Sequence, residues 1–302
     1  MVTIEIMVTE RAIAFDCGDD TLVGIAHLTD NSSKDGVLVV VGGPQYRVGS
    51  HRQFVLVGRH LARYGIPTFR FDHRGIGDSS GTSRSFLTLD EDIRSAVDAF
   101  LTICPELQQI YIWGLCDAAS AALMYVNRDP RIAGLILLNP WVRTEAGLAK
   151  ALLKTYYLKS IGDPRMWKNL LTGRPNIARG ITSFLANLFA AMASSTQVES
   201  NGNATNHKST SNRTADTSGS SFPEKMLSEL RNFKGPVLFI LSGNDVTAEE
   251  FRNLVKSNWQ WKKAVQRSSI TWFELPESNH TFSTQQWRDR VAERTSEWVL
   301  NQ

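Results

Sequence analysis

Hydrophobic positions in the first 140 residues fall into short runs separated by turn-rich segments. Two strand-like runs, RAIAF (11–15) and TLVGIAHL (21–28), flank DCGDD and predict a β-hairpin. Further strand-like runs follow at 36–41 (GVLVVV), 66–72 (IPTFRFD), 109–114 (QIYIWG) and 132–139 (IAGLILLN). Segments with helical spacing separate these runs, as at Phe54, Val57 and Leu61. A hairpin followed by repeated strand–helix units predicts an α/β protein with a mostly parallel central sheet and flanking helices.

The alternation stops after Trp141. Residues 143–192 have only helical patterns, and 193–221 is a Ser/Thr/Asn/Gly-rich stretch that lacks a packable face and is expected to be disordered. Strand patterns return at 235–243 and 270–275, and a last helix is expected from about Gln285. We therefore predict a core in two parts (1–142 and 223–302) and a helical lid insertion (143–222) that contains the polar loop.

Composition and charge narrow the class of protein. The 302-residue chain is 42 % hydrophobic, and no uncharged apolar stretch reaches the length of ~18 residues that a membrane helix needs, so we expect no stable membrane insertion. The first residues do not resemble a secretory signal, and three cysteines fit a reducing cytoplasm. Nothing in the sequence indicates a nucleic-acid partner.

Basic residues are concentrated in the predicted lid. Residues 143–180 contain eight basic and two acidic side chains, a net charge of +6 (8 − 2) in a chain of +3, which leaves −3 elsewhere. Two interpretations stay open: a solvated helix surface, or a lid that attracts an anionic substrate.

Candidate chemistry lies at the ends of the predicted strands. In YIWGLCDAASAAL (111–123), a strand, a tight turn with Cys116 and a small-residue helix follow one another, which is the context of a nucleophile elbow. Asp245 and His280 each come just after a later strand, and a Gly-rich loop follows the strand at 36–41. In open α/β sheets these strand ends meet at one edge, where ligands bind.

These motifs resemble the α/β-hydrolase superfamily over nearly the whole chain. FDHRGIGDSSG (71–81) is similar to the D-x-R-G-x-G-x-S turn of that fold, and the order nucleophile, acid, histidine is the same. More narrowly, GGPQYRVGSHRQF (42–54) with GLCDAASA (114–121) resembles exosortase A system-associated hydrolase 1, a group of bacterial hydrolases encoded near exopolysaccharide and protein-sorting genes. The elbow usually has serine where this chain has Cys116, and in this respect the chain resembles the dienelactone hydrolases, which also have cysteine. Ala118 replaces the second glycine of the elbow.

The resemblance implies a role for each matching residue. Cys116 would be the nucleophile, His280 the base and later the activator of water, and Asp245 the group that orients the imidazole. The backbone N–H groups of Asp117 and Gln45 would form the oxyanion hole, with Tyr46 as the alternative to Gln45. Pro44 has no N–H to offer.

Other interpretations of the same residues remain. Tyr46, Arg47, His51 and Arg52 are candidates for substrate binding, although the charged members of this group could instead fix the loop. Asp245 could merely cap a helix beginning near Ala248. Cys17 and Cys104 are expected to be buried structural thiols.

No His/Cys spacing of a zinc site and no phosphate-binding Gly-rich loop occurs, so neither a metal nor a cofactor is expected. The sequence favours a hydrolase that cleaves a carboxylic ester or thioester of a small molecule through an acyl-cysteine intermediate. If the basic lid attracts the substrate, that substrate is expected to be anionic or linked to a carrier. The alternatives are an acyltransferase with the same triad and a catalytically silent α/β-hydrolase-like binding protein.

Overall fold

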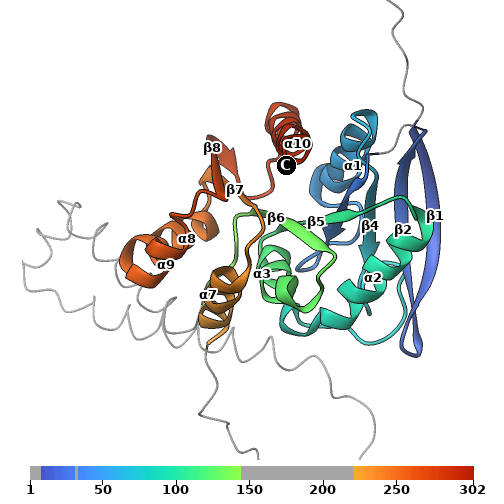
Figure 1. The fold of residues 1–302 in the computed structure, drawn as a ribbon, viewed down its shortest axis with the longest axis horizontal. Coiled ribbons are helices and arrows are strands. Elements are labelled where there is room, and N and C mark those ends of the chain that lie inside the picture. Colours follow the sequence, from blue (N-terminus) through green and yellow to red (C-terminus); the bar gives the residue numbers. More distant parts are fainter. Residues whose placement is uncertain (1–7, 31–32, 144–220) are drawn as a thin grey trace, which may run out of the picture. The chain divides into compact units, whose positions relative to one another are not determined.

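A computed structural model describes residues 8–30, 33–143 and 221–302, which belong to the same structural unit (Figure 1). The predicted lid, apart from its terminal residues, and its polar loop up to residue 220 lie outside the described residues. In the part of the chain that the structure describes, no helix is long and apolar enough to cross a membrane.

One mixed sheet forms the centre of the unit. Its strands are β1 (Val8–Cys17), β2 (Asp20–Thr29), β3 (Asp35–Val40), β4 (Thr68–Asp72), β5 (Gln109–Leu115), β6 (Ile132–Leu138), β7 (Val237–Asn244) and β8 (Ile270–Asn279). They lie in the order β1-β2-β4-β3-β5-β6-β7-β8. β1 pairs with β2 and β2 with β4 in antiparallel fashion, and all pairs from β4 to β8 are parallel. The predicted hairpin and parallel sheet are both confirmed.

Helices cover both faces of this sheet (Figure 1). They are α1 (Gln53–Arg63), α2 (Asp90–Ile103), α3 (Asp117–Tyr125), α7 (Phe222–Asn232), α8 (Val246–Ser257), α9 (Trp259–Ala264) and α10 (Gln285–Leu300), with short 3₁₀ turns at Ser50–Arg52, Phe86–Thr88 and Val126–Arg128.

Alternate side chains of the central strands enter two separate cores. Val37 and Val39 of β3 pack in the core beneath α1 and α10, whereas Leu38 and Val40 pack in the core beneath α2, α3, α7, α8 and α9. A strand buried on both faces needs apolar residues at every position, which is why β3 is a continuous hydrophobic run.

Helix α7 begins at the end of the predicted insertion (143–222). In the structure Ser221 is the N-cap of α7 and forms a capping box with Glu224, and Pro223 stands in the first turn. The pattern S-x-x-E with an early proline is a sequence signal for the start of a helix, because the Ser and Glu side chains accept hydrogen bonds from free N–H groups of the first turn.

Candidate active site

Cys116 occupies the sharp turn between β5 and α3. Its backbone has φ 63° and ψ −123°, a conformation that costs a non-glycine residue roughly 1–3 kcal/mol and is retained mainly at functional sites. The turn is held by hydrogen bonds from the Cys116 N–H to Leu138 O (2.9 Å) and from the Trp141 N–H to Cys116 O (3.1 Å). A side chain at Gly114 would place Cβ 2.7 Å from the Ala118 carbonyl, so strand and helix can cross only at glycine.

The three cysteines differ in their surroundings. Cys116 is partly exposed, whereas Cys17 and Cys104 are buried. Burial raises the pKa of Cys17 and raises that of Cys104 to about 11. Both buried thiols are therefore disfavoured as thiolates, and Cys116 is the cysteine that a reagent or substrate can reach.

His280 and Asp245 lie beside the elbow and contact each other. His280 follows β8, and its Nδ1 is 2.9 Å from Oδ2 of Asp245, which follows β7. The Asp245 carboxylate also accepts hydrogen bonds from the N–H groups of Thr247 (3.2 Å) and Ala248 (3.0 Å) at the start of α8. The two roles considered for Asp245, helix cap and partner of histidine, are thus compatible, and its side chain is only 6 % exposed.

The charges of this group stabilise one another. Hydrogen bonding first to Asp245 and then to the Cys116 side chain raises the pKa of His280 to about 10, against the opposing effect of burial. Burial alone would raise the pKa of Asp245, but hydrogen bonds from His280 and from the start of α8 bring it below its ordinary value. The structure therefore favours an imidazolium between a carboxylate and the sulfur of Cys116.

A buried network of polar side chains hydrogen-bonds the backbone of His280. Asn139, at the end of β6, donates through Nδ2 to His280 O (3.1 Å) and to Ser242 Oγ (2.9 Å), and its Oδ1 accepts from the Ser242 N–H (2.8 Å). Ser242 Oγ in turn donates to Asn279 O (2.9 Å). Asn139 and Ser242 are fully buried. Sequence reasoning missed both, although a polar residue at the end of an apolar strand was a signal.

The Gly-rich loop after β3 approaches the start of α3. The Gly43 N–H donates to Oδ2 of Asp117 at 2.8 Å, and a Cβ on Gly42 would lie 2.1 Å from Oδ1 of the same carboxylate. The Gln45 N–H points back to Gly42 O at a long 3.4 Å, and Gln45 Oε1 accepts from the Ser50 N–H at 3.1 Å. Gln45 remains a predicted donor to the oxyanion, and Gly43 is the residue of this loop whose N–H hydrogen-bonds the first residue of α3.

Arg47 anchors this loop to the turn after β4. Its guanidinium forms ion pairs with Asp72 and Asp78. Its N–H donates to Asp72 Oδ1 at 2.6 Å, and its carbonyl accepts from Arg70 at 3.0 Å. These contacts support the interpretation in which Arg47 fixes the loop.

The other three candidates for substrate binding, Tyr46, His51 and Arg52, are exposed. His51 and Arg52 have positive φ values of 53° and 61°. Their assignment to substrate binding remains a prediction.

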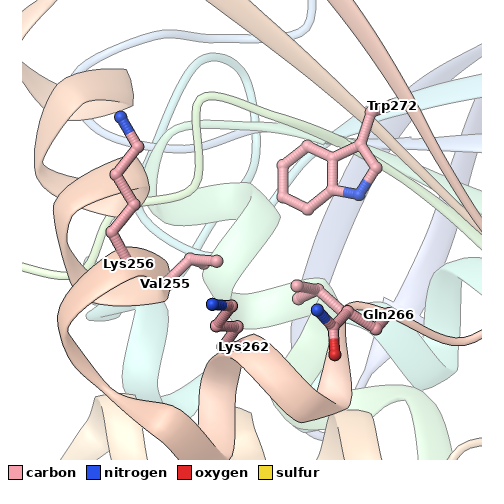
Figure 2. A pocket seen from close by; sticks show the side chains of 6 residues that line it. Val255, Lys256, Lys262, Gln266 and Trp272 are labelled. Atoms are coloured by element: carbon pink, nitrogen blue, oxygen red, sulfur yellow. The ribbon is translucent and has the colours of Figure 1, made fainter.

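A separate cavity of about 300 Å³ lies between α8, α9 and β8 (Figure 2). It is lined by Val255, Lys256, Lys262, Val265, Gln266 and Trp272. Val255 and Lys256 belong to the last turns of α8, about 15 Å along the helix from Asp245, so the cavity is not part of the site around Cys116. In the described ranges, no group of three or more His, Cys, Asp or Glu side chains could hold a metal ion.

The arrangement of the sheet and of these side chains defines an α/β-hydrolase: a parallel sheet with an antiparallel hairpin at one edge, an elbow after β5, an acid after β7 and a histidine after β8. The family model described as "Serine aminopeptidase, S33" matches residues 32–253, and the chain belongs to this hydrolase family. Within a family named for serine, this chain has Cys116 at the elbow.

Solved structures with the same fold cover nearly the whole chain. The Pyrococcus furiosus esterase Pf2001 is 17 % identical with a TM-score of 0.60 (97 % of this chain, 93 % of that chain). Dienelactone hydrolase from Anabaena variabilis is 14 % identical with a TM-score of 0.58 (97 % and 98 %). Est1E from Butyrivibrio proteoclasticus, solved with ferulic acid bound, is 16 % identical with a TM-score of 0.58 (96 % and 99 %). No curated protein sequence matches the chain.

Proposed function

We propose that the protein hydrolyses carboxylic esters or thioesters through a covalent acyl intermediate on Cys116. The observation that carries this proposal is that Asp245 binds Nδ1 of His280 at 2.9 Å while the Cys116 side chain is close enough to help raise the pKa of His280. A nucleophile, a base and a group that orients the base are the parts that covalent acyl transfer needs.

In the first half of the reaction, His280 takes the thiol proton of Cys116, and the sulfur attacks the acyl carbon. A C–S bond forms and the carbonyl π electrons move to oxygen, which the N–H of Asp117 and an N–H of the Gly-rich loop stabilise. The bond to the leaving group then breaks, and the His280 imidazolium gives its proton to the departing alcohol or thiol. The product is a thioester on Cys116 and a neutral imidazole.

In the second half, His280 takes a proton from water and the hydroxide attacks the thioester. The second tetrahedral oxyanion uses the same N–H groups, and its collapse releases the carboxylic acid and the Cys116 sulfur. Asp245 stays ionised and keeps the imidazole in one tautomer throughout, as its lowered pKa allows.

We propose further that the substrate is anionic, such as an acyl thioester on a phosphate-bearing carrier or an acidic sugar ester. The support is the net charge of +6 on residues 143–180, which we assign to a helical lid within 143–222. The resemblance of 42–54 and 114–121 to exosortase A system-associated hydrolase 1 supports a cytoplasmic role in exopolysaccharide or protein-sorting physiology.

Intact-mass analysis with a panel of p-nitrophenyl esters and acyl thioesters tests the main proposal. The protein should gain the mass of one acyl group, located by peptide mapping on Cys116, and Cys116→Ala should gain none. Cys116→Ser should lose most of the activity, because His280 would then have to activate a poorer nucleophile in a site shaped for sulfur. Cys104→Ala, which removes a buried thiol, is the control and should keep the adduct.

Two other results would point to other functions. Ester formation with an added acceptor alcohol, faster than hydrolysis, would indicate an acyltransferase. No adduct and no turnover with any member of the panel, together with no selective alkylation of Cys116 by iodoacetamide, would favour a binding protein.

A further inference from the structure

The carboxylate of Asp117 binds two backbone N–H groups beside the nucleophile. Its Oδ2 accepts from the Gly43 N–H at 2.8 Å, and its Oδ1 accepts from the Ala118 N–H at 3.0 Å. Gly43 lies 74 positions earlier in the chain, so the first of these bonds joins the Gly-rich loop to the start of α3. The loop can come this close because Gly42 has no side chain, whose Cβ would lie 2.1 Å from Oδ1.

An N–H group has one hydrogen and can point it at one strong acceptor. The oxyanion of an acyl adduct on Cys116 needs the N–H of Asp117 and one N–H from the Gly-rich loop, each about 3 Å away. Gly43 offers the loop N–H that lies against α3, and that hydrogen points at a carboxylate oxygen. A substrate carbonyl oxygen that uses this N–H would therefore compete with the Asp117 carboxylate.

We propose that the side chain of Asp117 occupies the oxyanion site of the resting protein and must be displaced by the substrate before Cys116 can react. This inference rests on the proposed function. Asp117 is the first residue of α3, where turning the side chain about χ1 breaks no bond of the helix backbone. Burial raises the pKa of the Asp117 carboxyl, although the N–H groups of Gly43 and Ala118 oppose this effect.

The need to displace Asp117 would make the protein selective among esters. A substrate must supply enough binding energy elsewhere to displace the carboxylate, so weakly bound esters would react poorly while a well-bound substrate opens the site. Asp117 is in this view a positioning residue, because it acts on the donor and not on the reacting atoms.

A simple aliphatic aldehyde is the probe for this site. The Cys116 sulfur adds to the aldehyde carbon, the π electrons become an oxyanion that needs the Gly43 N–H, and the His280 imidazolium can give that oxygen a proton to complete a hemithioacetal. Iodoacetamide reacts with the same sulfur by displacing iodide and forms no oxyanion. Comparing the two reagents separates the oxyanion site from the reactivity of the thiol.

We expect Asp117→Ala to bind the aldehyde about tenfold or more tightly than the wild-type protein, because the competing occupant is gone. The aldehyde affinity of each protein is compared with its own rate of alkylation by iodoacetamide, so that a change in the reactivity of the thiol itself is recognised. Asp117→Asn, which keeps the shape of the side chain with a weaker neutral acceptor, should show a smaller gain and serves if the alanine variant fails to fold. Asp90→Ala is the matched control, since Asp90 is the first residue of α2 and pairs with Arg128; it should change neither measurement.

Equal or weaker aldehyde binding by both Asp117 variants, with normal alkylation of Cys116, would overturn the role of Asp117 and leave the proposed function intact. Failure of the wild-type protein to react with either reagent at Cys116 would instead remove the proposed function, and this inference with it.

Discussion

The thiol of Cys116 and the imidazole of His280 form the pair on which the proposed chemistry depends. Cys116 lies in a strained turn. The pKa of His280 is raised, and the hydrogen bond to Asp245 is the largest cause. A cysteine in this position needs less help than a serine, because sulfur is intrinsically the stronger nucleophile.

The pH dependence of activity tests this pair. In the proposed mechanism His280 gives a proton to the leaving group. Because its pKa is raised to about 10, kcat/KM should fall as the pH rises through about 10. Asp245→Asn removes the largest cause of the raised pKa but keeps a good N-cap for α8, so the alkaline fall should move to lower pH. Glu249→Gln, in the first turn of the same helix, is the control. An alkaline fall at the same pH in the wild type and in Asp245→Asn would contradict the assigned pair.

Between elements, charged side chains join segments that are far apart in sequence. Arg47 joins the loop after β3 to the turn after β4 through the fully buried Asp72 and the exposed Asp78. Glu10 of β1, His27 of β2 and Arg70 of β4 form a second group, in which the Arg70 Nε–H donates to His27 Nε2 at 2.8 Å. The first group positions the candidate oxyanion loop, and the second stabilises the hairpin edge of the sheet.

Replacing Arg47 should destabilise the protein and impair the site together. Arg47→Met leaves the Asp72 carboxylate buried without its ion pair, which should lower the free energy of unfolding by about 3 kcal/mol in urea titrations. kcat/KM should fall with it, because the loop that carries Gly43 loses its anchor. Arg52→Met changes an exposed residue of the same loop and should cost under about 0.5 kcal/mol. If Arg47→Met raised KM for an anionic ester without loss of stability, Arg47 would bind substrate.

His27 should make the fold sensitive to acid. Burial lowers the pKa of His27 from its ordinary 6.5 to about 4. Between these values the unfolded chain binds a proton that the folded chain does not, so the free energy of unfolding should decrease as the pH falls from 6.5 to 4, by up to about 3 kcal/mol. His27→Gln, which keeps an acceptor for Arg70 but does not titrate, should remove this part of the pH dependence. The exposed His51→Gln should leave it in place, and equal pH profiles for the wild type and His27→Gln would refute the assignment.

Over the whole molecule, charge is distributed unevenly. Residues 143–180 have a net charge of +6 and the remainder −3, although the total is only +3. Charges gathered near a binding site raise the encounter rate with ligands of opposite sign, and salt screens the effect over about 10 Å at 0.1 M.

Salt dependence tests whether this charge serves recognition. kcat/KM for an anionic ester should fall several-fold, about tenfold at most, between low and physiological salt, while a neutral ester with the same acyl chain should change little. Lys150→Glu/Lys154→Glu should slow only the anionic substrate. The control is Lys225→Glu/Lys234→Glu, which reverses two lysines outside 143–180. The same salt response for both esters would show that the charge is ordinary surface.

The sequence by itself determined the strands, the fold class and the candidate triad. Strand and helix periodicity is local, so each of the eight strands could be predicted from a few consecutive residues. The elbow is also contiguous, from Gly114 to Ala118. Asp245 and His280 could then be placed, because the carboxyl ends of parallel strands meet at one edge of the sheet.

Tertiary structure alone decided the contacts that join these parts. The Gly43 N–H meets Asp117, Arg47 meets Asp72, and Asn139 meets Ser242 across 74, 25 and 103 positions of sequence. No periodicity indicates which carboxylate will face which N–H, because that depends on strand order and on the path of loops over the sheet edge. For the same reason the Gly-rich loop was recognised in the sequence, but only the structure brought the N–H of Gly43, and not that of Gln45, against the start of α3.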